Sequence, residues 1–274
     1  MSDMPTAEVL DEVSALYPDS LQWLMKNNRK RLIWQVDMVR QNVAPGGTLI
    51  DIGAGIIPFM LMCQRLGYKT TVVDDMEDDI LREPDTAKVV DLFAREGVRM
   101  VTGDVIAKGE ITQGGGPGGG PGGGPGEGTE EGTGDGGLDL VTSHDSMEHW
   151  HHSPKRMFHT LWERMKPGAL FWLGVPNCVN LRKRITVPLG YGKWSQMRHW
   201  YEPEVFRGHV REPDTGDLRY IARDLGAAKT QVIGRNWLGY RNPNKMIQTI
   251  TPLIDHAMRP FPAICSDIYL LAWK

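Results

Sequence analysis

TLIDIGAGIIPFM, residues 48–60, is the stretch that decides the fold. It begins with a short apolar run that contains Asp51, continues into the glycine turn Gly53–Gly55, and reaches Pro58 where the first turn of a helix is expected. A glycine turn directly after a strand lets backbone N–H groups and a helix N-terminus approach a ligand closely. The stretch therefore predicts a strand, a nucleotide-binding turn and a helix, in that order.

From this stretch onward, strand-like and helix-like patterns alternate along the chain. Their order, strand, helix, strand, helix, strand, implies right-handed crossovers and a parallel sheet. Strands are expected at 48–52, 70–73, 99–102, 138–142, 169–175, 229–233 and 267–273, and helices at 58–66, 86–96, 155–166, 217–225 and 243–258.

Two segments depart from this alternation. Residues 6–43 carry apolar side chains at three- and four-residue spacing, which predicts a helical cap over the sheet, or alternatively a lid over a substrate pocket. Residues 114–137 repeat GGGP and then run EGTEEGTGDGG, a composition typical of a flexible linker. We therefore expect a helical cap at 1–44 and one domain at 45–274, with a disordered Gly/Pro-rich insertion at about 112–137.

Charge, apolar runs and cysteine spacing indicate which partners and which cellular location to expect for the protein. The 274 residues have a net charge of −3, which gives no electrostatic preference for nucleic acid, so no nucleic-acid partner is expected. No apolar run approaches the roughly 20 residues that cross a bilayer, and the N-terminus is acidic where a signal peptide is basic. The three cysteines show no CxxC spacing. We expect a cytoplasmic protein without a transmembrane segment.

An acidic residue at the end of the second expected strand narrows the ligand class. Asp74 follows the glycine turn by about 20 residues, the position from which a carboxylate can bind a ribose diol. This arrangement suits a nicotinamide cofactor as well as S-adenosylmethionine. The dinucleotide pattern G-x-G-x-x-G is incomplete, because Pro58 stands where its third glycine is expected.

Several motifs together resemble one known family. They are DIGAG at 51–55, VVDD at 72–75, Gly103 with Asp104, and a block at 139–177 that contains S-x-x-S-M-E-H, K-P-G and a terminal P-N. They resemble the class I S-adenosylmethionine-dependent methyltransferases, most closely the group of ubiquinone-pathway and natural-product O-methyltransferases. The resemblance covers roughly residues 47–175. It implies an α/β, Rossmann-like three-layer sandwich with a seven-stranded, mostly parallel sheet whose last strand is antiparallel.

The resemblance also implies S-adenosylmethionine as cofactor and assigns residues to it. These residues lie at the ends of the first four strands, where ligands bind in open α/β sheets. They are Asp51, Gly53 and Gly55 around the methionine part, Asp74 or its neighbour Asp75 at the ribose hydroxyls, Met76 and Asp104 at the adenine, and Ser143 and His144 beside the sulfonium.

Catalysis needs mainly alignment of acceptor, methyl group and sulfur, although a hydroxyl or amine acceptor can also need a base. His144 is the first candidate base because it lies next to the expected methyl position, with His149 as the second candidate and His209 as a weaker third. We expect no metal. His151 and His152 are adjacent, which makes it difficult for both to bind one ion, and no zinc-type spacing is present.

A basic and aromatic segment after the fifth expected strand supplies candidates for binding the acceptor. A basic triplet is usually a solvated surface, but at this position it could hold a phosphate or carboxylate, with aromatic side chains stacking on a ring or sugar. The candidates are Arg182, Arg184, Tyr191 and Trp194.

The sequence thus predicts an S-adenosylmethionine-dependent methyltransferase that acts on an oxygen, or less favourably a nitrogen, of a small-molecule, glycan or lipid-linked acceptor. Two alternatives stay open at this point. One is an NAD(P)-dependent oxidoreductase, and the other is a methyltransferase-like binding protein without activity.

Overall fold

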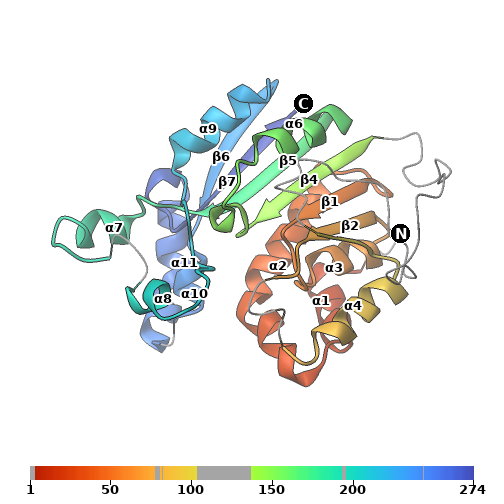
Figure 1. Cartoon of the computed structure of the whole chain (residues 1–274), viewed down its shortest axis with the longest axis horizontal. Coiled ribbons are helices and arrows are strands. Elements are labelled where there is room, and N and C mark those ends of the chain that lie inside the picture. Colours follow the sequence, from red (N-terminus) through yellow and green to blue (C-terminus); the bar gives the residue numbers. More distant parts are fainter. Residues whose placement is uncertain (1–3, 78–80, 82, 104–136, 193–195, 243) are drawn as a thin grey trace.

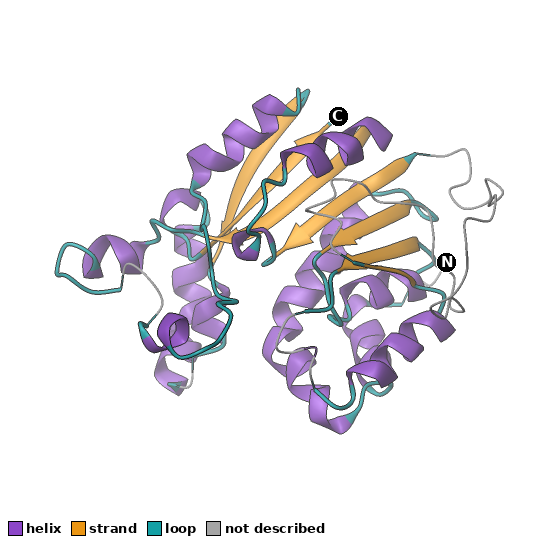
Figure 2. Cartoon of the chain, in the orientation of Figure 1, coloured by secondary structure: helices purple, strands orange, loops and turns teal. Residues whose placement is uncertain are grey.

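A seven-stranded sheet forms the middle layer of the molecule (Figures 1 and 2). The computed structural model describes residues 4–77, 81, 83–103, 137–192, 196–242 and 244–274. The strand order is β3-β2-β1-β4-β5-β7-β6. The strands are β1 (Thr48–Ile52), β2 (Lys69–Asp74), β3 (Arg99–Thr102), β4 (Leu138–His144), β5 (Met165–Pro176), β6 (Lys229–Arg235) and β7 (Asp267–Trp273).

The expected fold class is confirmed, including the single antiparallel strand. β1 pairs in parallel with both β2 and β4, whereas β7 pairs antiparallel with β5 and with β6. The chain winds outward from β1 to β3 and then returns to place β4 on the other side of β1. This reversal creates a switch point at the carboxyl ends of β1 and β4, where open α/β sheets bind their ligands.

Helices cover both faces of the sheet (Figure 1). The first four helices and α10 pack on one face, and α6 and α9 pack on the other, so the core consists of two apolar layers. The helices on the first face are α1 (Thr6–Ser14), α2 (Gln22–Asn42), α3 (Phe59–Arg65), α4 (Thr86–Arg95) and α10 (Trp237–Tyr240). The helices on the second face are α6 (Lys155–Arg164) and α9 (Thr215–Asp224).

Alternation along the strands decides which side chains reach the site. In β1, Ile50 and Ile52 join the layer under α6 and α9, whereas Leu49 joins the layer under α2 and α3. Because side chains alternate between the two faces of a strand, Asp51 lies on the same face as Leu49. The same period places Thr142 and His144 of β4 on the face of Leu140, under α2.

The expected helix at 6–43 is interrupted in the structure. α1 ends at Ser14, a 3₁₀ turn covers Asp19–Leu21, and α2 begins at Gln22. Pro18 lies immediately before the 3₁₀ turn, where its ring restrains the backbone and removes an N–H donor. α1 and α2 nevertheless share one apolar core with the sheet. The division of the chain at residue 44 stays a prediction, and the insertion at 112–137 lies almost wholly outside the described residues.

The structure also differs from expectation around β5. The helix expected at 155–166 ends at Arg164, and β5 includes the KPG segment. Pro167 cannot continue a helix, and the N–H of Gly168 donates to the carbonyl of Lys274 at the end of the neighbouring strand. The segment after β5, expected to be irregular, contains two short helices that project away from the sheet, at the left of Figure 1. They are α7 (Leu181–Thr186) and α8 (Arg198–Tyr201).

The last long helix, α11 (Lys245–Met258), lies beside α10 below the β6 edge of the sheet (Figure 1). Within the described parts of the chain, no helix combines the length and the apolar character needed to span a bilayer.

Candidate active site

The glycine turn after β1 is shaped by a contact from the far side of the switch point. Gly53 and Gly55 have φ angles of 73° and 53°, in the left-handed region that favours glycine. A Cβ atom on Gly53 would lie 1.7 Å from the Oγ of Ser146, which follows β4. The Ser146 hydroxyl is held in turn by the indole N–H of Trp150 at 3.0 Å. Only glycine fits at position 53.

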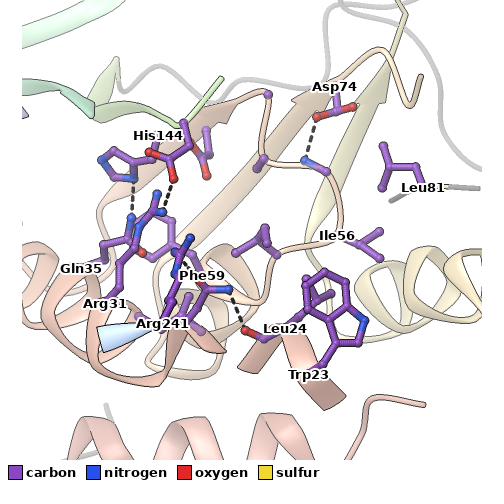
Figure 3. Close-up of a pocket in the computed structure, with 18 residues that line it drawn as sticks. Trp23, Leu24, Arg31, Gln35, Ile56, Phe59, Asp74, Leu81, His144 and Arg241 are labelled. Carbon is purple, nitrogen blue, oxygen red and sulfur yellow. Dashed lines mark hydrogen bonds and ion pairs between the residues drawn. The ribbon is translucent and has the colours of Figure 1, made fainter. Parts of the chain in front are cut away.

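Asp74 connects this turn to β2 (Figure 3). One of its carboxylate oxygens accepts from the N–H of Gly55 and the other from the N–H of Met76, both at 2.7 Å. The spacing between the glycine turn and the acid thus has a structural role besides the expected one. Asp75 is exposed and accepts from the N–H of Glu77, and Met76 has a φ of 61° and packs against the core.

Two cavities meet at the turn and share Gly53, Asp74 and Asp145. The first, of about 280 Å³, lies under α2 and is drawn in Figure 3; it is lined by Asp51, the turn, and side chains of α2. The second, of about 270 Å³, lies on the opposite side of the turn, and its lining includes Asp75, Gly103 and Ser146. An elongated ligand that passes over Gly53 would occupy both.

Asp51 is a buried acid in the wall of the first cavity. It is 4% exposed, and the hydroxyl of Thr142 donates to it at 2.8 Å. Burial raises the pKa of the Asp51 carboxyl to about 7, and the nearby Asp74 carboxylate adds to the effect. A positively charged ligand group beside Asp51 would favour the ionised form and bind it.

The sequence-based site missed the contribution of α2. Arg31 forms an ion pair with Asp145, a residue with a φ of 50°, and the side-chain nitrogen of Gln35 lies 2.9 Å from Nδ1 of His144 (Figure 3). The available signal was two polar residues spaced four apart on the buried face of an otherwise amphipathic helix. Arg31 and Gln35 are buried alongside Leu32, and together they close the first cavity.

His144 is packed among aromatic rings. Its ring centroid lies 4.4 Å from that of Trp172 and 5.7 Å from those of Phe59 and Tyr269. Burial, followed by the charge of Arg31, lowers the pKa of His144 well below its ordinary value. With Nδ1 accepting from Gln35, this neutral ring is better placed to form a wall of the cavity than to remove a proton.

The remaining predicted residues are divided among several places. Ser143 is buried, and among the described residues its hydroxyl has no hydrogen-bond partner. Asp104 and Trp194 lie outside the described residues. Tyr191 is 73% exposed on the projecting segment.

A third cavity, of about 960 Å³, lies between α7 and the segment before α9. Arg182 and Arg184 line it, as does His209, and His149 lines both this cavity and the second one. His149 is therefore at the boundary between the two, whereas His144 lines only the first cavity among these three.

This geometry agrees with what the chain is similar to. Residues 18–232 match the family model described as a methyltransferase domain. The match covers most of the chain, and the protein belongs to this family. It is an enzyme whose cofactor is S-adenosylmethionine, so the oxidoreductase and binding-protein alternatives are not supported. No curated protein matches the sequence.

Solved structures show the same fold at low identity. A cyclopropane-fatty-acyl-phospholipid synthase-like protein from Lactobacillus casei has a TM-score of 0.55 at 12% identity, with 97% of this chain and 99% of that chain covered. A SAM-dependent methyltransferase from Thermotoga maritima, titled a possible histamine N-methyltransferase, has a TM-score of 0.52 at 12% identity, with 98% and 99% covered. The subgroup of ubiquinone-pathway and natural-product enzymes stays a prediction.

Proposed function

We propose that S-adenosylmethionine spans the two cavities that meet at Gly53, and that the third cavity binds the methyl acceptor. The first cavity offers the carboxylates of Asp51 and Asp145 to the cationic methionine part. The second offers Asp74 and Asp75 to the ribose, with Gly103 at its far end. Support for this arrangement comes from the close approach that the Gly53 turn allows and from the acids on both sides of it.

Bound there, S-adenosylmethionine would supply an electrophilic methyl group on a positively charged sulfur. Transfer would form a bond from the methyl carbon to the acceptor oxygen as the bond from sulfur to that carbon breaks, leaving S-adenosylhomocysteine, and the acceptor hydroxyl would release its proton. The contribution of the protein is largely positional. The packed ring of His144 and the ion pair between Arg31 and Asp145 hold the wall of the first cavity rigid.

The acceptor class follows from the charge of the third cavity. Arg182, Arg184 and Arg211 line it together with apolar side chains such as Val187 and Phe206. Lys183 is paired with Glu212 and Arg211 with Asp217, but no ion pair or hydrogen bond of the Arg182 side chain occurs among the described residues. Such a cavity repels an ammonium group and attracts a carboxylate or phosphate.

This charge is the observation that carries the acceptor proposal. The protein transfers methyl to a hydroxyl oxygen of a small molecule that bears an acidic group and an apolar part. Glycan and lipid-linked acceptors with the same acidic group would use the same contacts.

The test is to measure formation of S-adenosylhomocysteine with a panel of hydroxylated aromatic acids, sugar phosphates and amines. We expect turnover with hydroxylated acids. Arg182→Ala should raise the KM of the acceptor about tenfold or more and leave the KM of S-adenosylmethionine unchanged, because a charge-assisted hydrogen bond is lost. Arg219→Ala, on the exposed face of α9, is the matched control. Turnover with amines alone, or an unchanged KM in Arg182→Ala, would contradict the proposal.

A further inference from the structure

Three metal-binding side chains gather at the boundary between the second and third cavities. Glu148 and His149 belong to the short 3₁₀ helix Met147–His149 after β4, and His209 precedes α9. One potential ligand atom from each lies within 4.8 Å of the other two. The N–H groups of Val210 and Arg211 donate to the carbonyl of Glu148 at 2.7 and 3.2 Å, which fixes the two segments together.

In each histidine, Nδ1 already has a hydrogen-bond partner, which fixes the orientation of the ring. Nδ1 of His149 lies 2.8 Å from the backbone carbonyl of Arg207, and Nδ1 of His209 lies 2.7 Å from a carboxylate oxygen of Glu212. In neutral histidines, an Nδ1–H that donates to these oxygens leaves the lone pair on Nε2. Histidines that bind metal ions are held in this way, by a carbonyl or carboxylate on the other nitrogen.

Glu148 supplies an observation independent of the histidines. Its side chain is buried at 1% exposure, and its Oε2 atom has no hydrogen-bond partner among the described residues. A buried carboxylate oxygen without a hydrogen-bond partner is costly. A bound cation would offset this cost.

We propose that Glu148, His149 and His209 bind a divalent transition-metal ion at the boundary between the cofactor and acceptor cavities. Two imidazoles and one carboxylate form a ligand set that suits Zn²⁺, Mn²⁺ or Fe²⁺, and three protein ligands leave coordination positions open. Ligand atoms of one such ion lie about 3–4 Å apart, given bond lengths of about 2.0–2.2 Å. The His209 side chain is 40% exposed and can move the short distance that closes the site.

The position of this site gives the ion a role in the reaction, and this part of the inference rests on the proposed function. His149 lines both cavities, so an ion bound to it is beside the acceptor rather than within the packed core. A divalent cation lowers the pKa of a neighbouring hydroxyl and orients its oxygen. The enzyme then needs neither His144 nor His149 as a general base, and the proton of the acceptor hydroxyl passes to solvent.

Calorimetry with the metal alone tests the site on the full chain after removal of bound metal with a chelator. Titration with ZnCl₂, and separately with MnCl₂, should show one ion per chain for at least one of the two metals. Glu148→Gln and His209→Asn should each weaken that binding about 100-fold or more, since changing only a partner of a ligand already costs about 10–100-fold. His256→Asn, an exposed histidine on α11, is the matched control and should bind as the wild type does.

The outcomes separate this inference from the proposed function. Circular dichroism shows whether each variant is folded, and His209→Asn, at the partly exposed position, gives a result if Glu148→Gln does not fold. The metal site is refuted if the wild type binds neither ion with one-to-one stoichiometry, or if folded His209→Asn binds as the wild type does. Failure to methylate hydroxylated acids with metal bound would instead refute the proposed acceptor and leave the metal site intact.

Discussion

Gly53 shows how a correctly predicted residue can have an unpredicted cause. The sequence indicates a glycine there so that the backbone can approach a ligand. The structure adds a contact from another segment, because Ser146 occupies the space that any side chain at position 53 would need. Contacts between residues about ninety positions apart are not encoded in a local motif, so this cause could not be read from DIGAG.

Gly53→Ala should therefore destabilise the protein by more than the backbone strain alone. Gly46→Ala is a matched control, because Gly46 also has a positive φ, 76°, but a Cβ there would meet nothing within 4 Å. We expect the free energy of unfolding to fall by about 1–2 kcal/mol in Gly46→Ala and by at least about 3 kcal/mol in Gly53→Ala. Urea denaturation measures both values, and equal losses would show that the Ser146 contact is unimportant.

Asp51 predicts a pH dependence of stability. Its pKa in the folded protein is about 7, whereas the ordinary value is 3.8, so the folded state retains a proton that the unfolded state has lost. Stability from this group is complete below about pH 4 and is lost as the pH rises through 7. The shift corresponds to a loss on the order of 4 kcal/mol.

Asp51→Asn should remove this dependence. The free energy of unfolding of the variant, measured relative to that of the wild type, should increase between pH 4 and pH 8. Denaturation curves at several pH values measure the difference. A difference that is constant with pH would contradict the elevated pKa.

Helix α2 was predicted as a cap, and its apolar stripe was identified correctly. Its role in the site was missed because the periodicity that indicates a helix is defined by apolar residues, and Arg31 and Gln35 interrupt that pattern without destroying it. The partners of these residues, Asp145 and His144, lie at the end of β4, more than 100 residues further along the chain. Only the tertiary structure could therefore show that Arg31 and Gln35 of α2 contribute to the site.

Two arginines on α2 provide a matched comparison. Arg31→Ala leaves Asp145 without its partner beside a buried cavity, and we expect a loss of about 3 kcal/mol in the free energy of unfolding. Arg29→Ala breaks an exposed ion pair in which the side chains of Arg29 and Asp11 are 45% and 61% exposed. This change should lower the free energy of unfolding by less than about 1 kcal/mol. Chemical denaturation compares the two, and similar losses would contradict the structural role of Arg31.

Across the whole molecule, the sequence was sufficient for the sheet and for the positions of Asp51 and Asp74 in β1 and β2, because these depend on local patterns. It was insufficient for the candidate metal site, where no metal was expected. Glu148 and His149 lie within the histidine-rich segment that was considered, but His209 is 60 residues further along the chain. The folding of the segment before α9 against the 3₁₀ helix after β4 brings them together.

The Gly/Pro-rich insertion gives a prediction about the whole chain. Deleting residues 115–134 should leave folding and methyl transfer largely intact, because its composition cannot bury an apolar core. The connection from β3 to β4 crosses β2 and β1, which is about 15 Å, and also returns along the parallel strands by about 20 Å; the roughly fifteen remaining residues reach about 50 Å when extended and can span this path. The measurements are the melting temperature and the rate of S-adenosylhomocysteine formation. Loss of both would show that the insertion is required.

The most direct test of the account is calorimetric titration with S-adenosylhomocysteine. The wild type should bind one molecule per chain with micromolar affinity, and Asp74→Asn should bind at least about tenfold more weakly, because a carboxylate that accepts two hydrogen bonds is replaced by an amide. Asp91→Asn, on the exposed face of α4, should bind as the wild type does. If the wild type does not bind, or if Asp74→Asn binds equally well, the two cavities at Gly53 are not the cofactor site.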